Sequence, residues 1–196
     1  MLTGVIAPPK SNPDEIAIET MNTVLGGAFI SRLNLNLRED KHWSYGAGSF
    51  LPDARAQRMF IAYAPVQTDK TKESIMEVSK ELKQITKDKM VTADELSMAK
   101  SNLTLALPGL WETNAAVSGS LGDLVRFSLP EDHYATYPTK VKSMTLDDMN
   151  KASTAVVRAD NLTWVIVGDR SVIEKGIREL NLGELRFIDA DGNPVQ

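Results

Sequence analysis

The chain has 196 residues, a formal net charge of −4 and no cysteine. This length allows one large domain or two small ones, and 42% hydrophobic with 24% charged residues is ordinary for a globular protein. The acidic balance argues against a nucleic-acid groove, which needs clustered lysine and arginine. No run of about 18 apolar residues is present, so no membrane-spanning helix is predicted. Without cysteine, disulfides and thiol catalysis are excluded, which fits both the cytosol and a periplasmic protein without bridges.

The N-terminal part of the chain predicts a short strand and then a helix. Residues 2–7 form a short apolar piece before two prolines, and a lone strand of this length needs neighbouring strands to pair with. We therefore expect the chain to be a piece of a longer protein. Residues 12–15, Asn-Pro-Asp-Glu, combine a capping residue, a proline suited to the first helical position and two carboxylates at the positive end of the helix dipole. The double glycine at 26–27 is expected to end this helix.

Residues 31–39 fit two kinds of secondary structure. Leu33, Leu35 and Leu37 alternate with asparagine, which is the period of a strand. Leu33 and Leu37 are also four residues apart, and Ser31 can cap a helix, so a short helix fits equally well. Periodicity alone leaves both alternatives open.

The rest of the chain predicts a hairpin, a run of helices and a final strand–helix–strand unit. Strands are expected over 44–51 and 57–66, joined by a turn at 52–55. Helices are expected over 71–87, from Thr92, over 110–127, from 129–132, from Thr145 and over 172–180, with a buried strand over 162–167 and a last short strand over 185–188. Because strands and helices are segregated, we predict an α+β fold with helices packed on a largely antiparallel or mixed β-sheet.

The common catalytic motifs are missing from this sequence. The two histidines, His42 and His133, are far apart, and neither lies in His-Glu-x-x-His or in its inverse, His-x-x-Glu-His. No Gly-x-Ser-x-Gly elbow is present, and residues 46–49, Gly-Ala-Gly-Ser, lack the third glycine of the dinucleotide fingerprint. These absences argue against a metal site, although two histidines and a carboxylate could still meet in space, and composition alone leaves a Ser-His-Asp set open.

Four short blocks of sequence carry a specific pattern. They are Leu-Gly-Gly at 25–27, Ser-Arg-Leu at 31–33, Leu-Arg-Glu at 37–39 and Ser-Tyr-Gly at 44–46. In order and spacing they resemble the insulinase/pitrilysin family of zinc metallopeptidases, which includes mitochondrial processing peptidase and the core proteins of the respiratory bc1 complex. The resemblance extends more loosely over essentially the whole chain, through the helix start at 91–96, the helix pair interrupted at Pro108 and the strand at 165–169.

The resemblance implies a domain organisation. Members of the family are built from paired α+β domains, of which one holds zinc with His-x-x-Glu-His and a downstream glutamate while its partner closes the chamber. Because the zinc motif is absent, this sequence resembles the partner domain, which implies no metal site, no cofactor and no catalytic residue in this chain. Residues 1–196 are then a single α+β domain, the last of a longer chain and without its first strands. The tail at 187–194 is similar to that of long bacterial members, and the resemblance favours the periplasm, with the cytoplasm as the alternative.

The resemblance also implies two substrate-binding residues, Arg38 and Tyr45. It makes residues 31–39 a short helix, with Arg38 in its last turn and Tyr45 on the strand that follows. A phenol near the scissile carbonyl can stabilise the developing negative charge by about 3–4 kcal/mol, and a guanidinium has five donors for peptide carbonyls. The simpler alternative is that Arg38 only complements the helix dipole and that Tyr45 is an ordinary strand residue. Arg32 is expected to be structural, pairing near Glu39 or with the sheet.

These patterns allow three functions. The first is a non-catalytic C-terminal domain that contacts the peptide substrate of a zinc-dependent metalloendopeptidase, with zinc in a partner domain on the same chain or another. The second is a purely structural or assembly domain, similar to the inactive core subunits of the family and stable as a dimer or in a complex. The third, an independent metal or hydrolase enzyme, needs His42 or His133 to meet a carboxylate in space. Under the first two, the isolated domain hydrolyses nothing.

Overall fold

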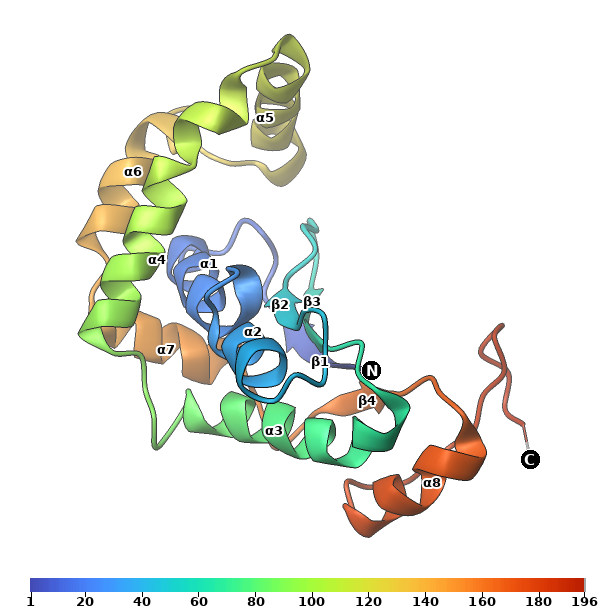
Figure 1. Ribbon diagram of the computed structural model, residues 1–196. Coiled ribbons are helices and arrows are strands. Elements are labelled where there is room, and N and C mark those ends of the chain that lie inside the picture. The colour runs from blue at the N-terminus through green and yellow to red at the C-terminus, as the bar shows by residue number, and fades with distance from the viewer. Residues whose placement is uncertain (196) are drawn as a thin grey trace.

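The computed structural model describes residues 1–195 and shows a β-sheet with helices packed on one face (Figure 1). The strands β1 (Leu2–Ala7), β2 (Gly48–Phe50), β3 (Arg58–Tyr63) and β4 (Thr163–Val165) form a four-stranded sheet in the order β2-β3-β1-β4. Each neighbouring pair is antiparallel. The structure therefore confirms the predicted α+β fold with helices on an antiparallel sheet.

Side chains of the two longest strands alternate between the faces of the sheet. Val5 and Phe60 are partners in the β1–β3 register, and both are buried in the core under the helices. Ile6 and Met59 are the next pair, and each lies on the outer face with 55% of its surface exposed. The outer face therefore presents an apolar surface, to which further exposed side chains contribute: Leu2, Phe50, Tyr63 and Val165.

The first helix, α1 (Glu15–Asn22), continues into a π-helical turn, η1 (Thr23–Gly27). It begins slightly later than predicted, because Asn12 forms a local turn in which its side-chain oxygen accepts a hydrogen bond from the Asp14 main-chain N–H at 2.9 Å. The helical segment ends at the double glycine, as predicted.

Gly26 allows η1 to approach the edge strand β2 very closely. A methyl group on its α carbon would lie 2.2 Å from the main-chain nitrogen of Ser49, so no larger residue fits without movement of the backbone. Beside this contact, the Asn22 side-chain amide donates to the Ser49 carbonyl at 3.1 Å, and the Ser49 hydroxyl donates to the Asn22 side-chain oxygen at 2.7 Å. The free edge of β2 is thus covered by η1.

The inner face of the sheet is completed by further helices. They are α3 (Thr71–Gln84), preceded by a 3₁₀ turn, η3 (Thr68–Lys70), then α4 (Ala93–Leu105) and α7 (Leu146–Val156). Both α4 and α7 begin with a capping box, formed by Thr92 with Glu95 and by Thr145 with Asp148. These starts agree with the predicted helix boundaries, and the helices close one continuous core with α1 and the sheet.

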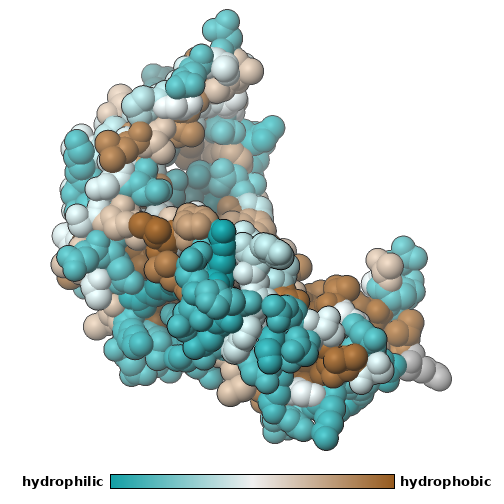
Figure 2. Space-filling model, in the orientation of Figure 1, coloured by the Kyte–Doolittle hydropathy of each residue, from teal (hydrophilic) through white to brown (hydrophobic). Residues whose placement is uncertain are grey.

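A helical arm extends away from the sheet (Figure 1). It consists of α4, the 3₁₀ turn η4 (Leu107–Trp111), α5 (Asn114–Phe127) and α6 (His133–Ser143). α4 and α6 run side by side, and α5 lies at their far end. A small separate cluster of Leu107, Tyr137 and Val141 holds the arm together. In the space-filling view the arm forms the upper part of a C-shaped outline with an open hollow (Figure 2).

The C-terminal part differs from the prediction in two places. The strand expected over 162–167 is shortened to β4 at the sheet edge, and Val167, which lies beyond the end of β4, is 88% exposed instead of buried. The prediction of a strand over 185–188 is wrong, because only an isolated bridge between Ile188 and Pro194 forms, around a turn at Asp189. The predicted helix before it is α8 (Arg170–Glu179), which packs on α3. Among residues 1–195, no helix is long and apolar enough to cross a bilayer.

Candidate functional site

Residues 32–40 form one helical segment, so the helix implied by the family resemblance is confirmed. It consists of an α-helical turn, α2 (Arg32–Asn34), and a π-helical turn, η2 (Leu35–Asp40). Leu33 and Leu37 are 1% and 0% exposed and point into the core, whereas Leu35 is 44% exposed. The segment therefore follows the four-residue spacing of Leu33 and Leu37 and forms a helix, and the alternation of leucine with asparagine does not produce a strand.

Arg32 ties this segment to the start of α4. Its guanidinium donates two hydrogen bonds to the Glu95 carboxylate, at 2.6 and 2.7 Å, and others to the carbonyls of Lys89 and Met90. The expected pairing with Glu39 or with the sheet is wrong, because the helical turn aims Arg32 at α4. Burial opposes ionisation of Glu95, but hydrogen bonds from Arg32 and Thr92 outweigh it and hold the Glu95 pKa below its ordinary value.

Arg38 lies in the last turn of η2, where it was expected. Its guanidinium lies over the ring of Phe29, 4.5 Å from the ring centre, and its Nε is 3.4 Å from a Glu39 carboxylate oxygen. About a third of the side chain stays exposed. The Arg38 carbonyl oxygen lies 3.0 Å from Nδ1 of His42, a residue with a left-handed φ of 57° that ends the helical segment.

Tyr45 lies in a loop before β2 and not on a strand, which corrects the expected position. The strand predicted over 44–51 is shortened to β2, because the Ser44 hydroxyl turns the chain. This oxygen lies 2.6 Å from the Pro65 carbonyl and 2.8 Å from the Gly46 carbonyl, and it accepts a hydrogen bond from the Gly46 N–H. The Tyr45 side chain is 97% exposed, and its hydroxyl has no hydrogen-bond partner among residues 1–195.

Asn34 connects the loops that carry Phe29 and Tyr45, and the sequence did not single it out. It is buried on α2, its side-chain nitrogen donates to the Phe29 carbonyl at 2.7 Å, and its oxygen accepts from the Ala47 N–H at 3.1 Å. The side chain of Asn34 therefore fixes both neighbouring loops from below. An asparagine facing the core side of a helix was the only sequence signal for this role.

Several exposed apolar side chains lie near Arg38 in the sequence, and one of them, Phe29, is in contact with its guanidinium. Phe29 and Ile30 are at least half exposed, and Leu35 and Tyr45 are further exposed side chains nearby in the sequence. No described contact joins the Arg38 and Tyr45 side chains directly. The Arg38 guanidinium and the Tyr45 phenol are exposed hydrogen-bond donors, which is the chemistry that can hold the carbonyls of an extended peptide.

The histidines are not brought together with metal-binding partners. His42 lies in the loop after η2, whereas His133 begins α6 and packs against the rings of Tyr134 and Tyr137. Burial lowers the pKa of His133. Among residues 1–195, no three His, Cys, Asp or Glu side chains are grouped so that they could hold a metal ion. The residues present therefore do not fit a zinc site.

Part of the chain matches a known family. Residues 2–103, which are 102 of the 196 residues and include η2 and the Tyr45 loop, match the model described as peptidase M16 inactive domain. With the α+β architecture, this match defines the class of the chain, a non-catalytic domain of a peptidase family. The chain belongs to the M16 peptidase family, and the resemblance seen in its sequence is confirmed. The search of the curated proteins found no match.

Solved structures share this fold. The peptidase M16 inactive domain from Pseudomonas fluorescens is 21% identical with a TM-score of 0.76, over 82% of this chain and 38% of that one. The inactive peptidase domain of a candidate zinc protease from Bordetella parapertussis is 20% identical with a TM-score of 0.64, over 83% and 88%. The periplasmic protease PqqL from Escherichia coli is 16% identical with a TM-score of 0.63, over 79% and 17%. The chain thus spans less than half the length of the Pseudomonas chain.

Proposed function

We propose that this chain is a substrate-contacting, non-catalytic domain of a zinc-dependent metalloendopeptidase that degrades peptides. The observation that carries the proposal is the presentation of Tyr45. Its side chain is almost fully exposed, while hydrogen bonds at Ser44, Gly46 and Ala47 fix the main chain on both sides of it. An exposed phenol on a fixed main chain is available to a ligand without rearrangement of the loop, which supports a binding role.

The proposed roles of the two site residues follow from their chemistry. The Tyr45 hydroxyl can donate a hydrogen bond to the carbonyl oxygen that becomes negative during peptide cleavage, a contribution of about 3–4 kcal/mol when the donor is preorganised. The Arg38 guanidinium has five N–H donors and can donate to neighbouring peptide carbonyls. The Phe29 ring below the Arg38 guanidinium restricts its movement, which lowers the entropy lost on binding.

Zinc belongs to the partner domain in this proposal. That domain, on the same chain or on another, would carry the zinc-binding residues, because residues 1–195 contain no group of side chains that could hold a metal ion. The isolated chain then hydrolyses no peptide. The family resemblance also supports a periplasmic location, as in the Escherichia coli relative.

The proposal is tested by supplying the zinc-bearing half and measuring cleavage of a peptide. We expect cleavage only with both halves, and we expect Tyr45→Phe to lower it by about 10²–10³-fold. Tyr63→Phe is the matched control, because Tyr63 is another partly exposed tyrosine whose loss of a hydroxyl should leave the rate unchanged. Full activity of both Tyr45→Phe and Arg38→Ala, with folding intact, would contradict the proposal.

A second candidate function is that of a purely structural or assembly domain. It is favoured by the apolar outer face of the sheet, where the register partners Ile6 and Met59 are exposed and Leu2 is exposed on the same face. Exposed apolar patches of this kind mark protein interfaces. This function predicts a stable dimer or complex, measured by light scattering after gel filtration, with no affinity for peptides. It also predicts that Tyr45 and Arg38 can be replaced without effect on that assembly.

A further inference from the structure

Phe29 lies in an exposed turn directly before the helical segment that carries Arg38. The turn is closed by a hydrogen bond of 3.0 Å from the Ser31 main-chain N–H to the Ala28 carbonyl. Its two central residues, Phe29 and Ile30, have 63% and 50% of their surfaces exposed. Turns are usually built from glycine, proline, asparagine, aspartate and serine, which favour turn conformations or bond to the main chain. The turn itself therefore does not explain two large apolar side chains at this place.

The main chain of Phe29 is held, so its ring is presented from a fixed position. The Phe29 carbonyl accepts a hydrogen bond of 2.7 Å from the side-chain nitrogen of the buried Asn34. The Arg38 guanidinium lies over the ring, with its central carbon 4.5 Å from the ring centre. Because 63% of Phe29 stays exposed, this contact leaves most of the side chain free for a ligand.

Peptides that bind to Arg38 come within reach of this ring. A peptide carbonyl bonded to the guanidinium lies about 3 Å from its nitrogen. Successive residues of an extended peptide are about 3.3 Å apart, and their side chains point alternately to opposite sides. A side chain beside the bound carbonyl can therefore pack on the Phe29 ring, whose centre is 4.5 Å from the guanidinium carbon. Such a contact removes apolar surface from water, which favours large apolar side chains over small or polar ones.

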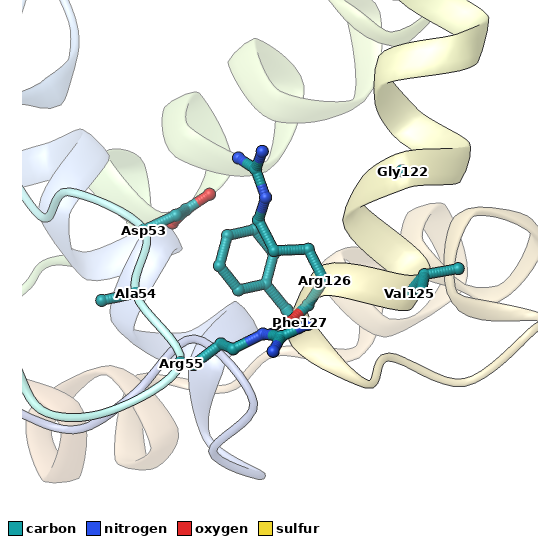
Figure 3. Close-up of a pocket in the computed structure, with 7 residues that line it drawn as sticks. All are labelled: Asp53, Ala54, Arg55, Gly122, Val125, Arg126 and Phe127. Carbon is teal, nitrogen blue, oxygen red and sulfur yellow. Dashed lines mark hydrogen bonds between the residues drawn. The ribbon is translucent and has the colours of Figure 1, made fainter.

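A pocket of about 710 Å³ lies between the helical arm and the connection from β2 to β3 (Figure 3). Its apolar ring, Phe127, is 5% exposed and so has little free surface for a ligand. The guanidinium groups of Arg55 and Arg126 point to opposite sides of this ring (Figure 3). Nε of Arg55 already donates to the Arg126 carbonyl. This pocket therefore does not place a donor beside an exposed ring, as the Phe29 turn does.

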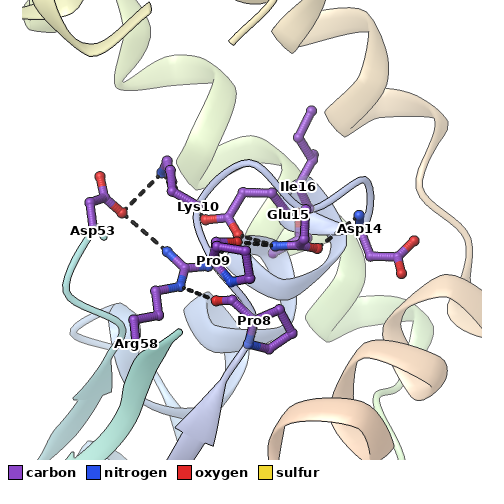
Figure 4. A network of polar contacts seen from close by, with 10 residues as sticks. Pro8, Pro9, Lys10, Asp14, Glu15, Ile16, Asp53 and Arg58 are labelled. Carbon is purple, nitrogen blue, oxygen red and sulfur yellow. Dashed lines mark hydrogen bonds and ion pairs between the residues drawn. The ribbon is translucent and has the colours of Figure 1, made fainter. Parts of the chain in front are cut away.

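One wall of the same pocket is tied into a network of ion pairs (Figure 4). The Asp53 carboxylate pairs with Lys10 at 3.3 Å and with Arg58 at 3.2 Å. Both cations also pair with Glu15 at the start of α1. These side chains are partners of one another and join the β2–β3 connection to α1, which is a structural role.

We propose that Phe29 is a specificity-determining residue, which binds a large apolar side chain of the peptide next to the carbonyl held by Arg38. The inference rests on the proposed function, because it takes Arg38 as a substrate contact. It adds a substrate class: peptides with a large apolar residue at this point are preferred over peptides with a small or polar one.

The test is an NMR titration of the full chain, without the zinc-bearing half, with two short capped peptides. Both peptides consist of glycine and serine, and one carries a central leucine where the other carries serine. We expect the leucine peptide to bind about tenfold more tightly, because part of its side chain is buried against the ring. The signals of the Phe29 ring should shift with the leucine peptide.

Variants of the site separate a direct contact of Phe29 from its support of Arg38. Phe29→Ser should abolish the tenfold preference for leucine. Phe29→Leu should keep most of it, because an apolar contact remains although the ring under the guanidinium is lost. Arg38→Ala should weaken both peptides by the same factor, since it removes the donor for the carbonyl that both peptides share.

Two variants at other exposed apolar side chains are matched controls. Phe187→Ser removes a ring that also lies against an arginine, 3.7 Å from the guanidinium carbon of Arg170, near the C-terminal end of the chain. Val125→Ser changes a 77% exposed side chain at the pocket of the helical arm. Both variants should keep the tenfold preference for leucine.

Equal binding of the two peptides, no binding at millimolar concentration, or a preference that persists in Phe29→Ser would overturn this inference. A preference that is lost in Phe29→Leu or in Val125→Ser would overturn it as well. Failure of the proposed function appears in a different measurement. It would be seen as an unchanged cleavage rate in Tyr45→Phe with the zinc-bearing half, and the leucine preference at Phe29 can persist in that case.

Discussion

Asn34 and Ala47 are joined by a hydrogen bond of 3.1 Å from the Ala47 main-chain N–H to the side-chain oxygen of Asn34. This bond connects the helical segment that carries Arg38 to the loop that carries Tyr45. The same asparagine holds the carbonyl of Phe29, whose ring lies under the Arg38 guanidinium. One buried side chain thus sets the positions of the loops on which both proposed substrate contacts depend.

Replacing Asn34 should loosen the Tyr45 loop. Asn34→Ala leaves the buried Ala47 N–H without an acceptor, which costs about 1–3 kcal/mol of unfolding free energy. Urea denaturation measures the loss of stability, and hydrogen exchange of the Ala47 amide measures the local effect. We expect faster exchange at Ala47 than the global loss alone produces. Unchanged protection of this amide would show that Asn34 does not hold the loop.

Gly26 should tolerate no side chain. Gly26→Ala places a methyl group 2.2 Å from the Ser49 nitrogen, so η1 and β2 must separate, at a cost of about 1–3 kcal/mol. Gly119→Ala is the matched control, because its added methyl group meets nothing within 4 Å and lies within α5. It should be neutral or stabilise by about 0.4–1 kcal/mol. Thermal unfolding of both variants tests this difference, and equal melting temperatures would contradict the predicted clash at Gly26.

The ion pair of Arg32 with Glu95 should make stability depend on pH. The folded pKa of Glu95 is below its ordinary value of 4.5, so the pair contributes fully above about pH 4.5 and is lost as the pH falls through the folded pKa. The difference in unfolding free energy between the parent chain and Glu95→Gln should therefore be large near pH 7 and shrink toward pH 3. Urea denaturation across this range measures it. A difference that stays constant with pH would contradict this role of the carboxylate.

The buried pair of Arg58 and Glu15 should be sensitive to removal of one partner. Arg58→Met removes the nearest cation of Glu15 and leaves only Lys10, at 3.4 Å, so we expect a cost that approaches the roughly 3–5 kcal/mol of a buried charge without any partner. Replacing both residues, with Glu15→Gln and Arg58→Met together, should cost less than the sum of the single changes. A double-mutant cycle from denaturation curves gives this coupling. Strict additivity would mean that the two charges act independently.

The sequence could predict the order and type of most elements, because caps and periodicity are local signals. The capping box of Thr92 with Glu95 placed the start of α4 correctly. Residues 31–39 could not be decided from periodicity, since the alternating leucines and the i,i+4 pair predict different structures. Only the family resemblance indicated a helix there.

Other features depended on contacts that no local pattern encodes. Val167 is exposed because the strand ends at Val165, although residues 165–167 are as apolar as a buried strand. Tyr45 leaves the strand because the Ser44 hydroxyl bonds to the carbonyl of Pro65, which is 21 residues away. Arg32 reaches Glu95, 63 residues away, instead of Glu39. Each difference arises from tertiary contacts between distant residues.

The central claim is that the Tyr45 hydroxyl acts on the transition state of peptide cleavage by a partner domain. The most direct measurement is the kcat and KM of the reassembled enzyme with Tyr45→Phe. We predict that kcat falls by about 10²–10³-fold while KM changes little, because the hydrogen bond is strongest to the developing oxyanion. An unchanged kcat, with the variant folded and assembled with the zinc-bearing half, would contradict the claim.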